Sequence, residues 1–233
     1  MTLSVIVPTF QEEANIGATI DAVRALGADV DLIVVDAGSA DKTMAIAAAR
    51  GARVFAAAER GRAAQMNQGA AAATGDVLLF LHADTIVPVD AHAAIANVLA
   101  DARIAGGCFR LRFDDDHPVL RVSSAFSGFG CRLFHYGDAG YFVRRSVFDE
   151  MKGFRAMPLL EDLDFWLRLT RRHRVVIAKP SVLTSARRFR DVGVVRQQTL
   201  GVAIAILFAL GVGAPRLAQL YRRHTRFRTP EVP

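Results

Sequence analysis

The chain has 233 residues, of which 52% are hydrophobic and 22% are charged. This length fits one large domain, or one domain with a short appendage, and the apolar content excludes a disordered chain. The only two cysteines, Cys108 and Cys131, exclude a disulfide scaffold and a Cys/His zinc site, and they fit a reducing compartment. The first residues lack a basic segment followed by an apolar one, so we expect no signal peptide.

The net charge of +6 is distributed unevenly. Residues 1–167 contain 15 Lys and Arg against 21 Asp and Glu, whereas residues 168–233 contain 14 basic residues and 2 acidic ones. We expect the basic end to meet phosphate groups or an anionic membrane surface. The arginines show no pattern of interleaved stacking aromatics, so we expect no nucleic-acid partner.

Short apolar runs alternate with helical patterns over the first 81 residues. Strands that are apolar throughout and alternate with helices indicate a parallel sheet covered on both faces. The predicted fold class is therefore α/β, with a Rossmann-like, mostly parallel sheet and helices on both faces. The expected strands are 3–8, 31–36, 53–56 and 77–81, and the expected helices are 16–26, 41–50 and 62–73.

The pattern is less regular after residue 84. We expect an α/β domain over residues 1–190 and a basic, apolar helical segment over residues 191–233, with no flexible linker between them. The expected later elements are helices at 89–100, 119–134 and 159–171 and strands at 106–113 and 140–144.

Polar residues directly follow three of the expected strands. The carboxyl ends of parallel strands meet at one edge of a sheet, where ligands bind. Any one acid there could simply cap a helix, so the prediction of a site rests on their coincidence. Glu12 and Glu13 are adjacent, so we expect only one of them to face a ligand. The residues at this edge are Pro8, Thr9, Glu12, Asp36, His82 and Asp84.

No glycine-rich phosphate loop, GxGxxG or GxxxxGK[ST], follows the first strand. A diphosphate would therefore have to be neutralised by a metal ion, and the hard carboxylate of Asp84 suits Mg²⁺ or Mn²⁺. The alternatives are a helix cap for Asp84 and ordinary packing for His82. Asp36 can accept hydrogen bonds from a base N–H, or it can cap the turn that follows it.

A second acidic centre, Glu161-Asp162-Leu163-Asp164, begins an apolar helix. One of these carboxylates could take a proton from an attacking hydroxyl, and the alternative is solvated acids favoured by the helix dipole. Two arginine groups could bind phosphate or form a solvated basic surface: Arg60 and Arg62, and the cluster Arg187, Arg188 and Arg190.

Together these residues resemble family 2 glycosyltransferases of the GT-A fold, from residue 3 to about 190. Several stretches are similar to the bacterial subgroup called "transferase 2, rSAM/selenodomain-associated", notably 81–85 and 185–189. The motifs that carry the family resemblance are Ser4-Val5-Ile6-Val7-Pro8-Thr9 with Glu12, Val34-Val35-Asp36 with Gly38-Ser39 and Asp41, Asn67 with Gly69, His82-Ala83-Asp84, Gly140 with Phe142-Val143-Arg144, and Glu161-Asp162 with Asp164 and Arg168.

The resemblance implies an inverting transfer of a sugar from a nucleotide diphosphate sugar to an acceptor hydroxyl. Asp84 would hold a divalent metal, Mn²⁺ or Mg²⁺, on the diphosphate, and Asp162 would be the general base, with Glu161 beside it. Asp36 would bind the base and Pro8, Thr9 and Glu12 would line the nucleoside. The other expected donor-binding residues are Arg62, Asn67, His82 and Arg188.

Three positions depart from the family pattern. His82 stands where the first Asp of the DxD motif is usual. Ala37 stands where family members commonly have a second Asp after the second strand, and Gln11 stands where Asn usually precedes Glu12. The QxxRW motif of polymerising members is missing, so we expect no processive synthesis. His82 and Ala37 also support an alternative of another class, a non-catalytic nucleotide-sugar or lipid-binding module. A nucleotidyltransferase would need a glycine-rich loop that the sequence lacks.

The uncharged run at 197–215 has three interpretations: a helix packed on the catalytic domain, an interfacial helix, or a homodimer interface. Its densest apolar part is too short to span a bilayer. The flanking arginines favour contact with anionic headgroups and a lipid-linked acceptor. We therefore expect a cytoplasmic protein, peripheral on the inner face of the cytoplasmic membrane.

Overall fold

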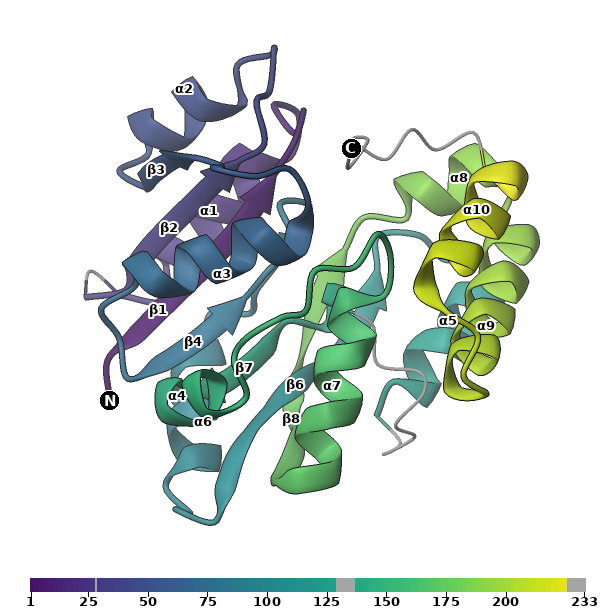
Figure 1. Cartoon of the computed structure of the whole chain (residues 1–233). Coiled ribbons are helices and arrows are strands. Elements are labelled where there is room, and N and C mark those ends of the chain that lie inside the picture. The colour runs from purple at the N-terminus through teal and green to yellow at the C-terminus, as the bar shows by residue number, and fades with distance from the viewer. Residues whose placement is uncertain (28, 129–136, 226–233) are drawn as a thin grey trace.

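The computed structural model describes residues 1–27, 29–128 and 137–225. Eight strands form a single sheet in the order β3-β2-β1-β4-β7-β6-β8-β5 (Figure 1). Four of its seven strand pairings are parallel, so the mostly parallel α/β sheet predicted from the sequence is confirmed.

The first half of the sheet is the part that the apolar runs predicted. β1 (Leu3–Thr9) pairs in parallel with β2 (Asp31–Asp36) and β4 (Val77–Phe80), and β2 pairs in parallel with β3 (Arg53–Ala56). Thr9 is the register partner of Asp36, so the ends of these two strands are level. The predicted meeting of strand ends at one edge is therefore present.

The second half is built differently. β7 (Tyr141–Arg144) runs antiparallel to both β4 and β6 (Ile104–Phe113). β8 (Arg174–Thr184), a strand that we do not predict from the sequence, pairs in parallel with β6 and antiparallel with β5 (Thr85–Ile86). The β6–β8 register shifts opposite Phe109 and Arg110, and this shift accommodates Lys179 and Pro180, which break the strand pattern in the sequence.

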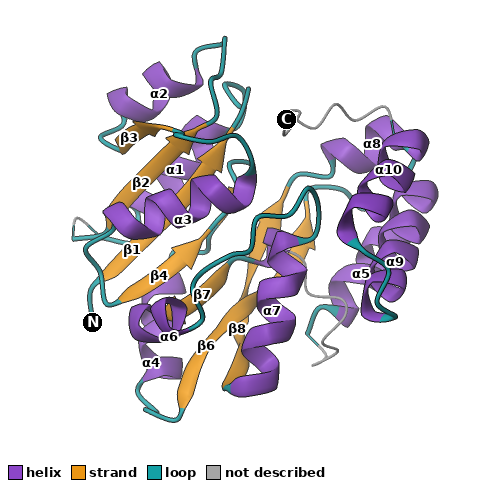
Figure 2. Ribbon diagram, in the orientation of Figure 1, coloured by secondary structure: helices purple, strands orange, loops and turns teal. Residues whose placement is uncertain are grey.

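Side chains alternate between two cores on the two faces of the sheet. Val5 and Val7 of β1 belong to one apolar cluster, together with α1 (Ile16–Arg24) and α4 (Ala91–Leu99). Ile6 belongs to the other, together with α3 (Arg62–Ala72), α6 (Arg145–Glu150) and α7 (Glu161–Arg172). This alternation follows from the period of two residues in a strand, and helices cover both faces as predicted (Figure 2).

Two further helices lie at positions close to those expected. α2 (Thr43–Ala49) lies within the predicted helix 41–50. α5 (Pro118–Phe126) accounts for the first part of the predicted helix 119–134, and positions 129–134 of that prediction lie outside the described residues, as does Cys131.

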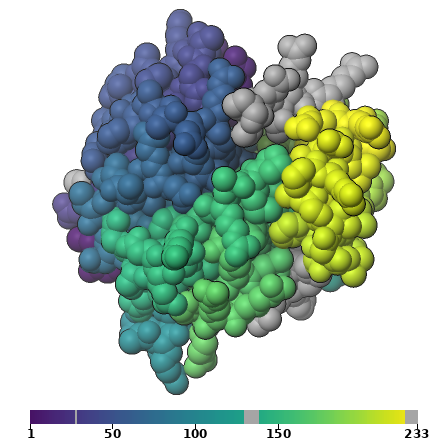
Figure 3. Space-filling view, in the orientation of Figure 1, coloured from purple at the N-terminus to yellow at the C-terminus, as the bar shows by residue number. Residues whose placement is uncertain are grey.

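The C-terminal segment packs against the rest of the protein. The domain boundary that we predict at residue 190 falls inside α8 (Arg187–Val192). Two more helices follow, α9 (Val194–Ala209) and α10 (Ala214–His224). α10, yellow in Figure 3, lies directly against the body of the molecule. An apolar cluster joins α9 and α10 to α7, so one face of the segment packs on the domain. Its buried members are Leu160, Leu163, Ile204, Ala205, Leu217 and Tyr221. Within the described parts of the chain, no helix has the length and apolar character that crossing a membrane requires.

Candidate active site

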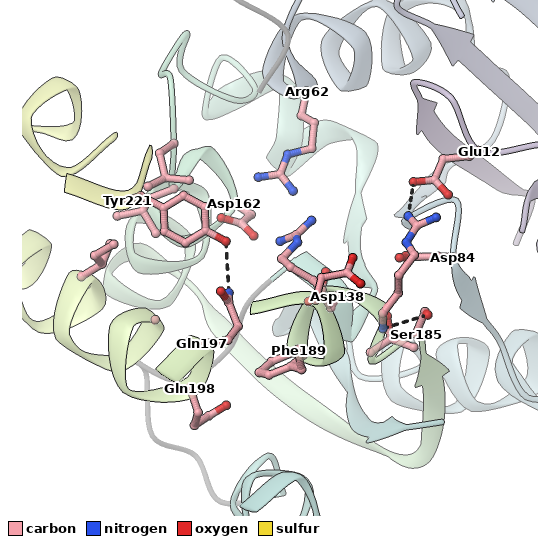
Figure 4. Close-up of a pocket in the computed structure, with 18 residues that line it drawn as sticks. Glu12, Arg62, Asp84, Asp138, Asp162, Ser185, Phe189, Gln197, Gln198 and Tyr221 are labelled. Carbon is pink, nitrogen blue, oxygen red and sulfur yellow. Dashed lines mark hydrogen bonds and ion pairs between the residues drawn. The ribbon is translucent and has the colours of Figure 1, made fainter. Parts of the chain in front are cut away.

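A cavity of about 160 Å³ lies between the strand ends and the C-terminal helices (Figure 4). Pockets that enclose a drug-sized ligand usually measure about 300–1,000 Å³, so this cavity encloses only part of a ligand as large as a nucleotide sugar. Its charged lining residues come from separate parts of the chain, and they include Glu12, Arg62, Asp84, Asp138, Asp162, Arg187 and Arg188.

Asp84 follows β4 and faces this cavity. Its pKa is raised, mainly because burial disfavours the charged form and also because Asp138 and Glu12 are negative neighbours. His82 and Arg188 offset part of that rise. Asp84 thus shares the cavity with the carboxylates of Glu12 and Asp138, and a cation beside Asp84 would offset this negative charge.

His82 turns towards Asp138, with its Nδ1 2.6 Å from a carboxylate oxygen of that residue. Burial works against a charged imidazole, but the interaction with Asp138 outweighs it and raises the pKa of His82. The same pairing lowers the pKa of Asp138 despite the burial of that carboxyl. His82 therefore reaches the site through Asp138, a residue that we do not predict from the sequence.

Glu12 faces the cavity and Glu13 does not, as expected for two adjacent carboxylates. A carboxylate oxygen of Glu12 lies 2.8 Å from Nη2 of Arg187, and its second oxygen accepts a hydrogen bond from Nδ2 of Asn15 at 2.7 Å. Glu13 instead accepts from the backbone N–H of Lys42 at 3.0 Å. The ion pair joins the end of β1 to the start of α8 across the cavity.

Glu161 and Asp162 occupy the first turn of α7, after Leu160 in a left-handed conformation with φ of 67°. Asp162 lines the cavity and accepts the backbone N–H of Leu163 at 2.7 Å. Glu161 is buried and lies 2.7 Å from Nε of Arg62. Burial raises the pKa of Glu161, Arg62 offsets part of this rise, and Asp162 adds to it. Of the two predicted catalytic carboxylates, Asp162 is therefore the one that lines the cavity.

Asp164 holds the local structure together. Its carboxylate lies 2.7 Å from Nε of Arg168 and 3.2 Å from Nη1 of Arg155. Arg168 also donates to the backbone carbonyls of Met151 and Gly153, at 3.1 and 2.8 Å. This network fixes the loop before α7 and leaves Asp162 as the acid of the cluster that lines the cavity.

Asp36 is fully buried and its carboxylate is used within the chain. One oxygen accepts the backbone N–H groups of Gly38 and Ser39, at 3.0 and 2.7 Å. The other accepts the hydroxyls of Ser39 and Thr9, at 2.6 and 2.9 Å. Asp36 thus caps the turn that follows it, which is one of the two roles predicted for it. Pro8, Thr9 and Asp36 do not line the cavity, so a role in binding the nucleoside stays a prediction.

Asn67 makes two hydrogen bonds to the backbone of one residue. Its Nδ2 donates to the carbonyl of Phe154 and its Oδ1 accepts the N–H of Phe154, both at 2.9 Å. Gly153 has a φ of 63°, and a Cβ there would lie 2.5 Å from the Asn67 Oδ1. Asn67 therefore joins α3 to this turn and is not among the residues that line the cavity, so a role in donor binding stays a prediction.

The arginines of the cavity lie beside acids. Arg62 pairs with Glu161 and Arg187 with Glu12, and both pairings raise the pKa of the guanidinium. Arg188 lies near enough to both carboxyls to offset part of the rise in the pKa of Asp84 and to contribute to the lowered pKa of Asp138. Arg187 and Arg188 are thus the arginines of the cavity that lie near Asp84, where a guanidinium could meet a diphosphate.

The C-terminal helices contribute residues that the sequence did not single out. Gln197 of α9 and Tyr221 of α10 both line the cavity, and Nε2 of Gln197 donates to the Tyr221 hydroxyl at 3.0 Å. The uncharged run of this segment and its flanking arginines predict contact with lipid or phosphate. Composition cannot predict a buried hydrogen bond between side chains of two different helices.

The fold is that of known glycosyltransferases. A mannosyltransferase from Pyrobaculum calidifontis, solved with GDP-Man and Mn²⁺, superposes with a TM-score of 0.71 at 18% identity, over 94% of this chain and 69% of that one. Glucosyl-3-phosphoglycerate synthase from Mycobacterium tuberculosis, solved with Mn²⁺, UDP and phosphoglyceric acid, superposes with a TM-score of 0.66 at 22% identity, over 91% of this chain and 79% of that one. At these identities the likeness shows the fold, and the predicted GT-A fold is confirmed.

Sequence comparison gives the family. Curated glucosyl-3-phosphoglycerate synthase from Mycobacterium tuberculosis is 36% identical over 137 residues, which is 54% of this chain and 41% of the relative. The chain thus spans about two fifths of the length of that relative. Residues 4–161 match the family described as "Glycosyl transferase family 2". Because this match covers more than half of the chain, the protein belongs to glycosyl transferase family 2.

Proposed function

We propose that this protein transfers a sugar from a nucleotide diphosphate sugar to an acceptor hydroxyl, with inversion at the anomeric carbon. The observation that carries the proposal is that Asp84 and Asp162 line one cavity from different sides (Figure 4). Relatives with this fold were solved with UDP or GDP-Man and a divalent metal, which supports the same donor class here.

The acidic residues around Asp84 fit a divalent metal. Burial and the negative charges of Asp138 and Glu12 raise the pKa of Asp84, so a cation would relieve their repulsion. The described residues contain no group of three His, Cys, Asp or Glu side chains that could enclose a metal by themselves. Mg²⁺ and Mn²⁺ often take one or two carboxylates plus substrate phosphates, so this donor set suits them. When bound, Mn²⁺ or Mg²⁺ would neutralise charge on the leaving diphosphate.

In the proposed reaction Asp162 removes the proton from the acceptor hydroxyl. The hydroxyl oxygen then forms a bond to the anomeric carbon on the face opposite the diphosphate. The bond between that carbon and the diphosphate breaks, and the leaving group takes the electron pair. Arg62 and Arg188 would stabilise its charge, and His82 would orient Asp138 beside Asp84.

The test measures donor hydrolysis and transfer with Mn²⁺ across UDP-, GDP- and dTDP-sugars. We expect Asp84→Ala and Asp162→Asn to lower turnover by about 10²-fold or more, as for other general bases and charge-stabilising groups. Asp21→Asn is the matched control, because Asp21 is exposed and pairs with Arg50 outside the cavity. Full activity of both site variants would overturn the assigned roles. Nucleotide binding without any turnover would instead favour the non-catalytic alternative.

We further propose that the exposed face of α9 meets an anionic membrane surface, which would present a lipid-linked acceptor. Val195, Ile206 and Leu210 are exposed apolar residues of this segment, and the exposed Arg196 follows Val195 in the sequence. Arg196 also lines a groove with Arg222 and Arg223 of α10. Apolar and basic side chains together suit an interface with anionic headgroups.

Vesicle sedimentation tests this second proposal. The full chain should sediment with phosphatidylglycerol vesicles and not with phosphatidylcholine vesicles, and Leu210→Ser or Arg196→Gln should reduce the bound fraction. Equal binding to both lipids would contradict it. A dimer seen by light scattering that Leu210→Ser dissociates would assign the same face to a homodimer.

A further inference from the structure

Gln197 carries a buried amide that is only half satisfied. The residue is 7% exposed, and its Nε2 donates to the hydroxyl oxygen of Tyr221. Within the described parts of the chain, its carbonyl Oε1 has no hydrogen-bond partner. Almost all buried polar atoms have a hydrogen-bond partner. We therefore expect this oxygen, at the wall of a cavity, to accept a hydrogen bond from a group outside the chain.

Tyr221 completes the pair with a hydrogen of its own. Its oxygen accepts from Gln197, and no described group accepts the hydroxyl hydrogen. The two side chains therefore offer the cavity one acceptor, Oε1, and one donor, the Tyr221 O–H. A ligand hydroxyl can both donate and accept a hydrogen bond, so a neutral hydroxyl is the group that satisfies both.

The walls around this pair are apolar. Leu159, Leu160, Gly201 and Ile204 line the same cavity, and Asp162 lies on the same side of it (Figure 4). Leu160 and Ile204 also belong to the apolar cluster that holds α9 and α10 against α7. A ligand in this position would bury an apolar group while its hydroxyl reached the polar pair.

Charge argues against an anionic ligand here. The arginines that line the cavity already lie beside acids: Arg62 lies 2.7 Å from Glu161 and Arg187 lies 2.8 Å from Glu12. Arg188 lies near Asp84 and Asp138. The cavity also holds the carboxylates of Asp162 and Asp191 on the side of the C-terminal helices. These carboxylates would repel an anion, whereas they would not repel a neutral group.

We propose that Gln197 and Tyr221 form an acceptor subsite for a neutral hydroxylated compound with an apolar flank, such as a sugar or polyol carried on an alkyl chain. The inference rests on the proposed function, because it places the acceptor beside Asp162. In this arrangement the pair holds one hydroxyl of the acceptor and so orients its neighbour towards the Asp162 carboxylate. The acceptor class differs from the phosphoglycerate bound by the synthase of the same fold.

The test uses the full chain and n-octyl β-D-glucoside as the neutral probe, with n-octyl phosphate as the anionic probe of equal chain length. Binding is followed by calorimetry, without donor, so that the result does not depend on turnover. We expect the glucoside to bind more tightly than the phosphate. Gln197→Met and Tyr221→Phe should each weaken glucoside binding about tenfold, the effect of losing one well-placed hydrogen bond.

Gln219→Met is the matched control, because Gln219 is an exposed glutamine of α10. It should leave glucoside binding unchanged. Tyr221→Phe keeps the ring in the apolar cluster, so it remains informative if thermal melting shows that Gln197→Met has lost its fold. UDP binding with Mn²⁺ should be equal in all variants.

Three results would overturn the subsite. These are a wild type that binds no glucoside, site variants that both bind it as tightly as the wild type, and n-octyl phosphate that binds more tightly than the glucoside. A failure of the proposed function is read separately, as a lack of nucleotide binding and of donor hydrolysis in the wild-type chain. The two failures are therefore distinguishable.

Discussion

Nε of Arg62 lies 2.7 Å from a carboxylate oxygen of Glu161, and this ion pair joins the first residue of α3 to the first residue of α7. The side chain of Glu161 is 4% exposed and that of Arg62 is 34% exposed. The pair thus ties together two helices that are 99 positions apart in the chain, beside the carboxylate proposed as general base.

Removing Arg62 should leave a buried carboxylate without its partner. We expect Arg62→Gln to lower the free energy of unfolding by about 2 kcal/mol, below the usual cost of breaking a buried pair because Arg62 is partly exposed. Glu161→Gln alone should also destabilise, because it leaves the guanidinium unpaired. The double variant should cost less than the sum of the two, and urea unfolding of all four proteins measures this difference. Strictly additive costs would show that the two side chains do not interact.

The pairing of His82 with Asp138 predicts the result of restoring a second acid to the motif. His82→Asp would place a carboxylate against Asp138, where Nδ1 now lies 2.6 Å away. Repulsion among carboxylates should lower the melting temperature in EDTA, and Mn²⁺ should restore more of it than in the wild type. His82→Asn is the neutral control. An equal response of the Asp and Asn variants to Mn²⁺ would contradict a cation site at this position.

Asp138 shows why part of the site was not predictable. The apolar runs of β1, β2, β3 and β4 predicted those strands and hence Glu12 and Asp84 at one edge. Asp138 reaches that edge because β7 runs antiparallel to β4 with Tyr141 opposite Phe80, so the residues before Tyr141 continue past the end of β4 towards His82. This pairing joins segments about sixty residues apart, and hydrophobic periodicity contains no information about such contacts.

The C-terminal helices illustrate the same limit. Composition predicted a helical segment with an uncharged run, and left packing, lipid contact and dimerisation open. The apolar cluster with Leu163 decides that one face packs on the domain. Gln197 and Tyr221 meet only because α9 and α10 pack together, so their shared position at the cavity could not be read from the order of residues.

Asn67 allows a test that separates its structural contacts from the predicted role in donor binding. We expect Asn67→Leu to lower the free energy of unfolding by about 1–3 kcal/mol, because the buried backbone groups of Phe154 would lose their partners. Affinity for UDP with Mn²⁺ should stay close to that of the wild type. Urea unfolding and calorimetry measure the two quantities. The control is Gln68→Leu on the same helix, whose amide bonds the exposed backbone of Ala56 and Ala58, so its loss should destabilise less. A large loss of nucleotide affinity with unchanged stability would support the donor-binding role instead.

Asp31 gives a prediction of pH dependence away from the site. Burial alone would raise its pKa, but hydrogen bonds from Arg53, Thr74 and Ser4 outweigh burial and lower the pKa below 3.8. A carboxyl whose pKa is lower in the folded state stabilises the protein above the unfolded-state pKa, and this contribution is lost as the pH falls through the folded-state value.

Asp31→Asn should therefore destabilise most at neutral pH. We expect a loss of about 1–3 kcal/mol at pH 7, which is the range for hydrogen bonds to a charged group, and a smaller difference from the wild type below about pH 3.5. Urea unfolding at several pH values checks this. Asp21→Asn, an exposed acid on α1, controls for the change in net charge and should show little dependence. The prediction is contradicted if Asp31→Asn destabilises the protein equally at both pH values. The charge of Asp31 would then contribute nothing to holding Ser4, Arg53 and Thr74, and the loss would come from the changed shape of the side chain.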